Sequence, residues 1–175
     1  MRKKTVCIFL ILMWVFSVKA EIKVFFSPSN DCENEIIDLI NNSQKTIDIA
    51  VYAINNRNIV KALEKAHRRG IKLRILTDKS QASLKSSKAR QIFANGINIK
   101  VHTKYKSAHD KFAIFDDAFI LTGSYNWTNA ASKQNTENCI FLLSEPEIVK
   151  KYQNRFNELW SVNSEKKSKA WFNGK

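Results

Sequence analysis

Short β-branched runs alternate with amphipathic stretches from residue 22 onward, and this alternation constrains the fold more than any other feature. The runs lie at residues 22–26, 46–52, 72–77 and 97–102. They have the length and composition of strands, and stretches between them repeat apolar residues at helical spacing. Asn30 and Glu33 have the spacing of a capping box that opens the first helix. This order predicts an α/β fold: one domain with a mixed, mostly parallel sheet and helices on both faces.

The second half of the sequence departs from this alternation. Two apolar runs, Lys111–Phe115 and Phe119–Thr122, are separated by three residues that include two aspartates, which predicts a tight hairpin. A further strand is expected over residues 138–143. The last helix carries an apolar stripe that ends at Trp160, and the tail from Ser161 is polar and basic.

The first twenty residues are expected to lie outside the domain. A basic start is followed by the apolar run Val6–Val18 and by a small-residue pattern that ends at Ala20. This organisation is typical of a secretory signal peptide over residues 1–20, and it predicts an exported protein, periplasmic or secreted, with its domain at residues 21–175. The run is shorter than the about 20 residues of a bilayer span, but a membrane anchor through residues 5–18 stays as the alternative.

The chain is strongly basic, with 29 lysines and arginines against 16 acidic residues and a formal charge of +13. Residues 1–20 contain four of the basic residues and no acidic one, so the remainder keeps a charge of +9. This excess favours a polyanionic partner, either nucleic acid or an anionic membrane. The residues of one basic stretch form a solvated face or a groove for a nucleic-acid backbone; they are Lys79, Lys85, Lys88, Arg90, Lys100, Lys104 and Lys106.

The cysteines and histidines do not predict a metal site. After residue 20 the cysteines are Cys32 and Cys139. An oxidising compartment permits a disulfide between them, and buried free thiols are equally consistent with their apolar surroundings. There is no C-x-x-C pair, and the histidines at positions 67, 102 and 109 are scattered, so the sequence does not have the ligand spacing of a zinc site.

The polar residues that suggest chemistry lie between positions 109 and 137. In an extended segment His109 and Lys111 project from the same face, about 7 Å apart. The return strand of the hairpin delivers Ser124 and Asn126, and Glu137 opens the next strand. An imidazole, an ammonium, a hydroxyl, an amide and a carboxylate would then converge. This set suits an anionic, oxygen-rich ligand such as a phosphodiester.

The spacing His109-x-Lys111-x4-Asp116-x6-Gly123-Ser124-x-Asn126 resembles the HKD motif of the phospholipase D superfamily. Six residue types at fixed spacing arise by chance on the order of once in ten million starting positions. The resemblance extends over most of residues 22–160. It points to a branch of short, exported bacterial endonucleases with one motif per chain, and it implies the phospholipase D-like fold.

The family reaction needs two histidines, so the resemblance implies a homodimer whose site is shared across the twofold axis. His109 of one subunit would form a phosphohistidine, and His109 of the other would protonate the leaving group and then activate water. The resemblance also makes Glu137 the residue that orients the nucleophilic imidazole.

The same resemblance gives roles to the other motif residues. Lys111 and Asn126 would bind the non-bridging phosphate oxygens, and Ser124 would support this substrate-binding site. Asp116 is grouped with the catalytic residues as part of the motif, although a structural role in the hairpin is favoured. No metal and no other cofactor is implied.

Three functions follow from these observations. The leading hypothesis is an exported, metal-independent endonuclease that cuts DNA or RNA with little sequence preference. The second is a phospholipase D-type lipid hydrolase acting on a phospholipid such as cardiolipin. The third is a non-catalytic nucleic-acid-binding protein, against which the complete motif argues. The sequence leaves open the choice between DNA and RNA, the strandedness of the substrate and the biological role.

Overall fold

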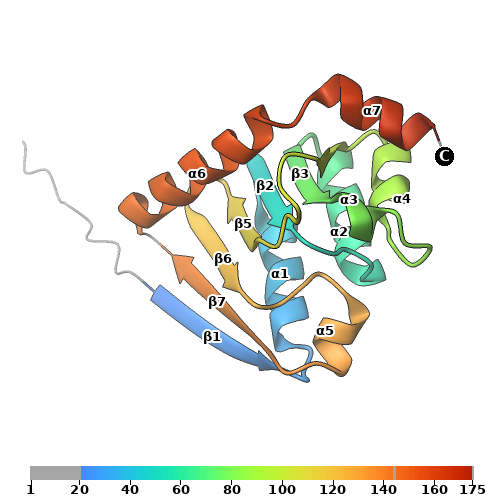
Figure 1. Cartoon of the computed structure of the whole chain (residues 1–175). Coiled ribbons are helices and arrows are strands. Elements are labelled where there is room, and N and C mark those ends of the chain that lie inside the picture. Colours follow the sequence, from blue (N-terminus) through green and yellow to red (C-terminus); the bar gives the residue numbers. More distant parts are fainter. Residues whose placement is uncertain (1–20, 144, 175) are drawn as a thin grey trace, which may run out of the picture.

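The computed structural model describes residues 21–143 and 145–174 (Figure 1). The predicted signal peptide therefore lies outside the described residues. The strands are β1 Glu21–Ser27, β2 Thr46–Val51, β3 Lys72–Asp78, β4 Asn98–His102, β5 Lys111–Phe115, β6 Phe119–Gly123 and β7 Glu137–Leu143. The helices are α1 Asp31–Asn42, α2 Arg57–Arg68, α3 Lys79–Ala82, α4 Ala89–Ala94, α5 Asn129–Lys133, α6 Pro146–Ser161 and α7 Glu165–Asn173.

The seven strands form one sheet in the order β1-β7-β6-β5-β2-β3-β4. The predicted α/β fold with a mixed sheet is confirmed, but the prediction that most of its strands pair in parallel is wrong. Only β2–β3 and β3–β4 pair in parallel, whereas β1–β7, β7–β6, β6–β5 and β5–β2 are antiparallel. Parallel neighbours need a crossover connection, which α2 provides between β2 and β3, and α3 with α4 provide between β3 and β4. The hairpin from β5 to β6 inserts antiparallel strands into the middle of the sheet.

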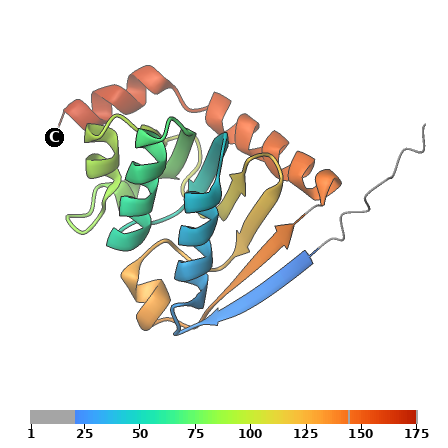
Figure 2. The same ribbon diagram turned by 180° about the vertical axis from the view of Figure 1, so that it is seen from behind.

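Helices cover both faces of the sheet, as predicted. Successive strand residues point to opposite faces, so Phe112 and Ile114 of β5 pack with α6, while Ala113 and Phe115 face the other core. That second core is covered by α1 and α2, which lie in front of the sheet when the molecule is turned (Figure 2). Phe156 of α6 is fully buried against the first core. The sheet is therefore held between two separate apolar layers.

The polar tail that was expected after residue 161 instead contains α7. Its Phe172 is buried and stacks on Phe93 of α4, with 4.6 Å between ring centroids. Ser168 accepts a hydrogen bond from the backbone N–H of Val101. α7 thus covers the edge strand β4, whose free backbone groups would otherwise invite pairing with another chain.

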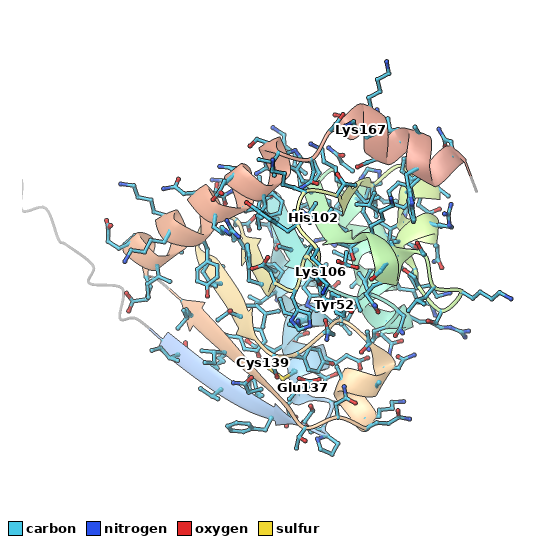
Figure 3. The ribbon with its side chains drawn as sticks, in the orientation of Figure 1. Tyr52, His102, Lys106, Glu137, Cys139 and Lys167 are labelled. Carbon is cyan, nitrogen blue, oxygen red and sulfur yellow. A yellow bond between two sulfur atoms is a disulfide. The ribbon has the colours of Figure 1, made fainter. Side chains whose placement is uncertain are left out.

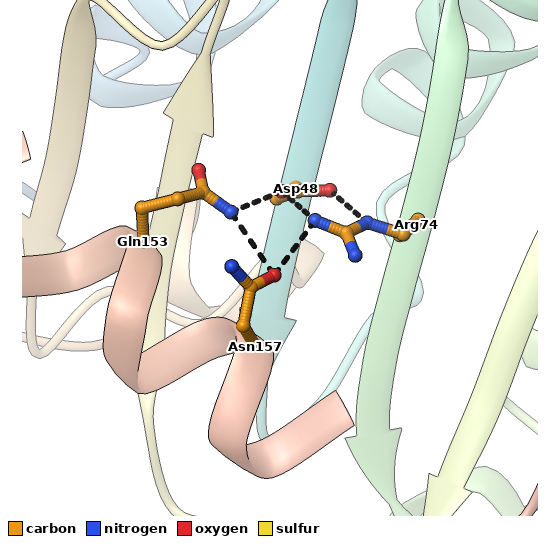
Figure 4. Close-up of polar contacts among 4 residues, drawn as sticks. All are labelled: Asp48, Arg74, Gln153 and Asn157. Carbon is orange, nitrogen blue, oxygen red and sulfur yellow. Dashed lines mark hydrogen bonds and ion pairs between the residues drawn. The ribbon is translucent and has the colours of Figure 1, made fainter. Parts of the chain in front are cut away.

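A polar network fixes α6 on the sheet (Figure 4). Arg74 of β3 donates to both carboxylate oxygens of Asp48 on β2, with its Nε 2.7 Å from Oδ1. From α6, Gln153 donates to Asp48 at 2.8 Å, and Asn157 accepts from Arg74 at 3.1 Å. Asp48 is buried, so its charge needs these partners. The network sets the rotation of α6 about its own axis.

Cys32 of α1 and Cys139 of β7 form a disulfide, with 6.2 Å between their Cα atoms. This settles the choice between a bridge and two free thiols. Both residues are fully buried in the core beneath α1. The bond joins positions 107 residues apart and ties the helix to the strand that begins with Glu137.

We expect the disulfide to contribute about 2–5 kcal/mol to the free energy of unfolding, because it closes a long loop in the unfolded chain. Replacing both Cys32 and Cys139 with alanine should lower the midpoint of urea unfolding by a corresponding amount. Dithiothreitol should destabilise the wild-type chain and leave the double variant unchanged. Equal effects of the reductant on both proteins would contradict a stabilising bridge.

Candidate active site

The candidate residues gather at one edge of the sheet, where several strands end or begin. Lys111, the first residue of β5, pairs with Val51 at the end of β2, and Glu137, the first residue of β7, pairs with Ser27 at the end of β1. Figure 3 labels Tyr52 and Glu137, which come from this edge. Ligands of α/β proteins commonly bind outside the carboxyl ends of the strands. The geometry brings together the strand ends that the sequence singled out.

His109 and Lys111 are in direct contact. Lys111 Nζ lies 3.0 Å from His109 Nδ1 and donates to the backbone carbonyl of His109 at 2.6 Å. Partial burial lowers the pKa of Lys111 below its ordinary value, and the carboxylates of Glu137 and Asp110 oppose this shift. The predicted convergence of an imidazole and an ammonium is therefore present in the fold.

Tyr52 is a part of this cluster that the sequence reasoning missed. Its ring centroid is 4.5 Å from that of His109, and Lys111 Nζ lies 5.2 Å from its centroid. The Tyr52 hydroxyl accepts a hydrogen bond from Gln81 at 2.9 Å. The available signal was an aromatic residue at the end of the buried strand that leads to the site. Tyr52 packs against the imidazole and limits where it can turn.

Gly123 is required by the close approach of two strands. Its φ is +142°, and a Cβ there would lie 2.3 Å from the carbonyl oxygen of Asn138 in β7. Beyond it, the backbone N–H of Ser124 donates to the side chain of Asn138 at 3.0 Å, and the Ser124 hydroxyl donates to Glu137. Ser124 is thus held beside the carboxylate with which it was expected to share a site.

Glu137 and Asn126 have unequal sets of partners. The Glu137 carboxylate accepts from Ser124 and, at 3.0 Å, from Asn135. Among residues 21–143 and 145–174, no hydrogen bond joins Glu137 to His109. The side-chain oxygen of Asn126 is buried and has no hydrogen-bond partner within the same part of the chain. An orphaned oxygen of this kind has unmet capacity to accept a hydrogen bond.

A buried polar network supports the loop that carries Ser124 and Asn126. The Tyr125 hydroxyl hydrogen-bonds to Ser132, whose hydroxyl also lies 2.8 Å from a carboxylate oxygen of Glu33. Burial raises the pKa of Tyr125 to about 12. Glu33 accepts a further bond from Asn58 at 2.8 Å. This chain of contacts anchors the loop to α1.

The predicted capping box is therefore wrong. The Asn30 side chain makes no capping hydrogen bond, and Glu33 turns inward instead of back toward the helix start. Burial alone would raise the pKa of Glu33, but the hydrogen bonds from Asn58 and Ser132 favour its ionised form, and the pKa is lowered on balance. Tertiary partners override the local pattern here.

Asp116 does not join the cluster, which corrects its grouping with the catalytic residues. It lies at the opposite end of β5 from Lys111. Its carboxylate accepts hydrogen bonds from the backbone N–H groups of Gln44, Lys45 and Thr46 at 2.7, 2.7 and 2.9 Å. Its φ is +53°, which aspartate tolerates better than most residues. Asp116 holds the hairpin turn against the start of β2.

Part of the basic stretch is structural. Lys100 is buried and donates to the carbonyl of Trp160 at 3.0 Å, and Arg90 donates to the carbonyl of Phe172 at 2.9 Å. His102 is buried too, and its Nε2 accepts the backbone N–H of Tyr105. The exposed members of the stretch are Lys79, Lys85, Lys104 and Lys106.

The described residues contain neither a metal-binding cluster nor a membrane-spanning helix. Within residues 21–143 and 145–174, no group of three or more His, Cys, Asp or Glu side chains could hold a metal ion. In the same part of the chain, none of the helices has the length and apolar character needed to cross a bilayer.

Residues 36–160 match the family described as cardiolipin synthase, PLD-like domain. The chain therefore belongs to the phospholipase D superfamily. The α/β fold agrees with this: Nuc, a phospholipase D family member from Salmonella typhimurium, superposes with a TM-score of 0.79. That comparison has 25% sequence identity and covers 83% of this chain and 97% of Nuc.

Two curated relatives are similar at the level of sequence. The mitochondrial cardiolipin hydrolase of Chlamydomonas reinhardtii is 32% identical over 129 residues, which is 74% of this chain and 57% of that protein. The phospholipase D of Rickettsia conorii is 32% identical over 140 residues, covering 79% of this chain and 70% of the relative. The chain thus spans little more than half of the first relative.

Replacing Asp116 with alanine should separate structure from chemistry. We expect the free energy of unfolding to fall by about 2–4 kcal/mol, because three backbone N–H groups lose a charged acceptor and alanine is strained at a positive φ. Phosphodiesterase activity per folded molecule, measured with bis(p-nitrophenyl) phosphate, should stay within about twofold of wild type. His109→Ala should lose its activity and keep a free energy of unfolding close to that of wild type. A loss of activity in a fully folded Asp116→Ala protein would restore Asp116 to the catalytic group.

Proposed function

We propose that this protein is an exported, metal-independent phosphodiesterase that cleaves DNA or RNA as a nonspecific endonuclease. The observation that carries the proposal is the contact of His109 with Lys111 at the sheet edge where Ser124, Asn126 and Glu137 also gather. This edge offers a nucleophile, a cation and neutral hydrogen-bonding groups for one phosphate. The likeness to Nuc, a phospholipase D family member, over nearly all of that protein supports phosphodiester chemistry of the phospholipase D type.

The first chemical step uses the imidazole as nucleophile. When a phosphodiester binds, Lys111 moves from His109 Nδ1 to a non-bridging oxygen and neutralises charge there. In the tautomer that reacts, the ring proton is on Nδ1 and is donated to Glu137, which orients the ring and leaves the lone pair of Nε2 free. Nε2 attacks phosphorus, a P–N bond forms, and the P–O bond to the leaving group breaks.

The second imidazole comes from a second copy of the chain. His109 of that copy gives its proton to the leaving oxygen and then, as a base, takes a proton from water. The hydroxide attacks phosphorus, the P–N bond breaks, and the electron pair returns to Nε2. Asn126 contributes side-chain hydrogen bonds to the phosphate, and Ser124 holds Glu137 in place. The two imidazoles need opposite protonation states, which a single phosphate between them can support.

A homodimer follows from the single motif in each chain. The sequence has two His-x-Lys pairs, at positions 102/104 and 109/111, but only the second is followed at the motif spacing by Asp116 and by Gly123-Ser124-x-Asn126. His102 is also buried and hydrogen-bonded. A twofold axis beside His109 would supply the second imidazole from the same position of the partner.

Nucleic acid is the favoured substrate because of charge. The region after residue 20 has a formal charge of +9, and the exposed lysines at 79, 85, 104 and 106 are positions where a phosphate backbone can be contacted. Each such contact releases counterions from the polyanion and strengthens binding at low salt.

A lipid substrate is the second candidate. Alternate residues of the edge strand β1 are exposed and apolar: Ile22 is 61% exposed, Val24 48% and Phe26 67%. Phe26 pairs with Asn138, one position from Glu137, so an apolar surface reaches the edge that holds the site. The relative from Chlamydomonas is named for cardiolipin hydrolysis.

Export is supported by the disulfide and by the sequence of residues 1–20. The Cys32–Cys139 bond is of a kind that persists in oxidising compartments such as the periplasm. Residues 1–20, which precede the domain, begin with basic residues, continue with an apolar run and end with small residues. We place the protein in the periplasm or outside the cell, with attachment to a membrane through residues 5–18 as the alternative.

A chelator tests whether the reaction is independent of metal, and substitution of His109 tests whether the imidazole is needed. The protein without residues 1–20 should cleave single-stranded DNA, plasmid or RNA in excess EDTA at an undiminished rate. His109→Ala should lose more than about a thousandfold in activity, while its melting temperature stays near that of wild type. Cardiolipin hydrolysis without nucleic-acid cleavage would favour the second candidate. Loss of activity in EDTA would contradict a metal-independent reaction.

Mixed dimers test the shared site. Wild type and His109→Ala, unfolded together in equal amounts and refolded, should form wild-type homodimers as about one quarter of all dimers. If both imidazoles are needed, the activity of the mixture should be about a quarter of the activity of the same total amount of pure wild-type protein. Activity of about one half would mean that each chain works alone.

A further inference from the structure

A cavity of about 440 Å³ lies beside the His109–Lys111 pair and extends onto α6. Cavities of about 300–1,000 Å³ commonly hold ligands much larger than one phosphate group. Its lining side chains come from the site, from the β5–β6 hairpin and from one face of α6; they are His109, Asp110, Lys111, Phe112, Thr122, Gly123, Lys151, Tyr152 and Arg155. The residues from α6 have no part in the reaction described above.

The charge of the cavity wall is positive beyond Lys111. Lys151 and Arg155 add two cations, and Asp110 is the only carboxylate among the lining residues. The two cations are four positions apart on one helix, so they lie on the same face and repel each other weakly. Such a pair is better tolerated where an anion binds between or beside its members.

Both α6 cations have donors available for a ligand. Lys151 is exposed, and within the described residues it forms no ion pair. Arg155 is paired with Glu158 through Nη1 at 3.0 Å, which leaves further N–H groups of its guanidinium for a phosphate. Between them, Tyr152 packs edge-on against Phe112 at 5.0 Å and donates to Thr122 at 3.1 Å. Tyr152 thereby forms a fixed floor to the cavity.

The fold holds this face of α6 toward the site. Gln153 and Asn157 bind the Asp48–Arg74 pair on the sheet side of the helix (Figure 4). Phe156 is fully buried on that side as well. These contacts set the rotation of the helix. The face of α6 that carries Lys151 and Arg155 is therefore held toward the cavity.

We infer that Lys151 and Arg155 form a subsite for a second phosphodiester of the same nucleic-acid strand, next to the one held by His109 and Lys111. The inference rests on the proposed nuclease function and makes it more specific. A substrate with two neighbouring phosphodiesters would be preferred over a substrate with one. The preference would arise from α6 and would not require any base to be recognised.

Two oligonucleotides that differ by one phosphodiester provide the test. Thymidylyl-thymidine has a single phosphodiester, and the corresponding trinucleoside diphosphate has two. Wild type should cleave the longer compound with a kcat/KM about tenfold higher than the shorter one, in line with one added charge-assisted contact. Lys151→Gln and Arg155→Gln should each remove most of that advantage and leave cleavage of the shorter compound within about twofold of wild type.

Lys150→Gln is the matched control. Lys150 is exposed on the same helix and does not line the cavity, so its loss changes the net charge equally but should preserve the preference for two phosphodiesters. On a longer single strand, each α6 variant should also reduce the slope of log affinity against log salt by about 0.7. The control should change that slope less.

The outcomes separate the subsite from the nuclease function. If wild type cleaves neither oligonucleotide nor longer DNA and RNA, the nuclease function fails and the inference fails with it. If wild type cleaves both compounds equally, or if Lys150→Gln behaves like Lys151→Gln, only the subsite is overturned. Phosphatidylglycerol and cardiolipin form the lipid pair with one and two phosphodiesters. An α6-dependent preference confined to that pair would overturn the assignment to nucleic acid.

Discussion

The backbones of β6 and β7 approach so closely at Gly123 that a side chain there would collide with the carbonyl of Asn138. The rest of the site depends on this approach. It sets Ser124 against Glu137 and turns the chain toward Asn126, while the other end of the hairpin begins with Lys111. Because β5 and β6 are consecutive strands, one tight turn fixes both halves of the motif relative to each other. A phosphate-binding edge is thus built mainly from a single hairpin and the strand beside it.

Buried polar contacts hold that edge in place from below. Glu33, Ser132 and Tyr125 link α1 to the loop after Gly123, and the Cys32–Cys139 bond joins the same helix to β7. On the other face, Asp48 and Arg74 fix α6. Each network contains a carboxylate in a buried position, and each carboxylate has hydrogen-bond partners from neighbouring elements. The site is held by two helices, one on each face of the sheet.

Local patterns in the sequence predicted the strands, the hairpin and the convergence of His109 with Lys111, because the two-residue period of a strand is enough to place them. The disulfide needed the pairing of β7 with β1 and the packing of α1, which no local pattern contains. Glu33 had the spacing of a cap, but Asn58 and Ser132, distant in sequence, were the stronger partners. The tail gave only two aromatic residues as a sign of α7, and Tyr52 could be placed at the site only once β2 was known to lie beside β5.

Trapping the covalent intermediate tests the central claim most directly. Wild-type enzyme mixed with a phosphodiester substrate for one turnover, quenched in alkali and digested, should yield a peptide containing His109 with the added mass of the phosphoryl group and of the one substituent that stays esterified to it. A phosphohistidine adduct should survive alkali and disappear after brief treatment with acid. An adduct on a different residue, or full product release with no labelled peptide at any time during the turnover, would contradict the account.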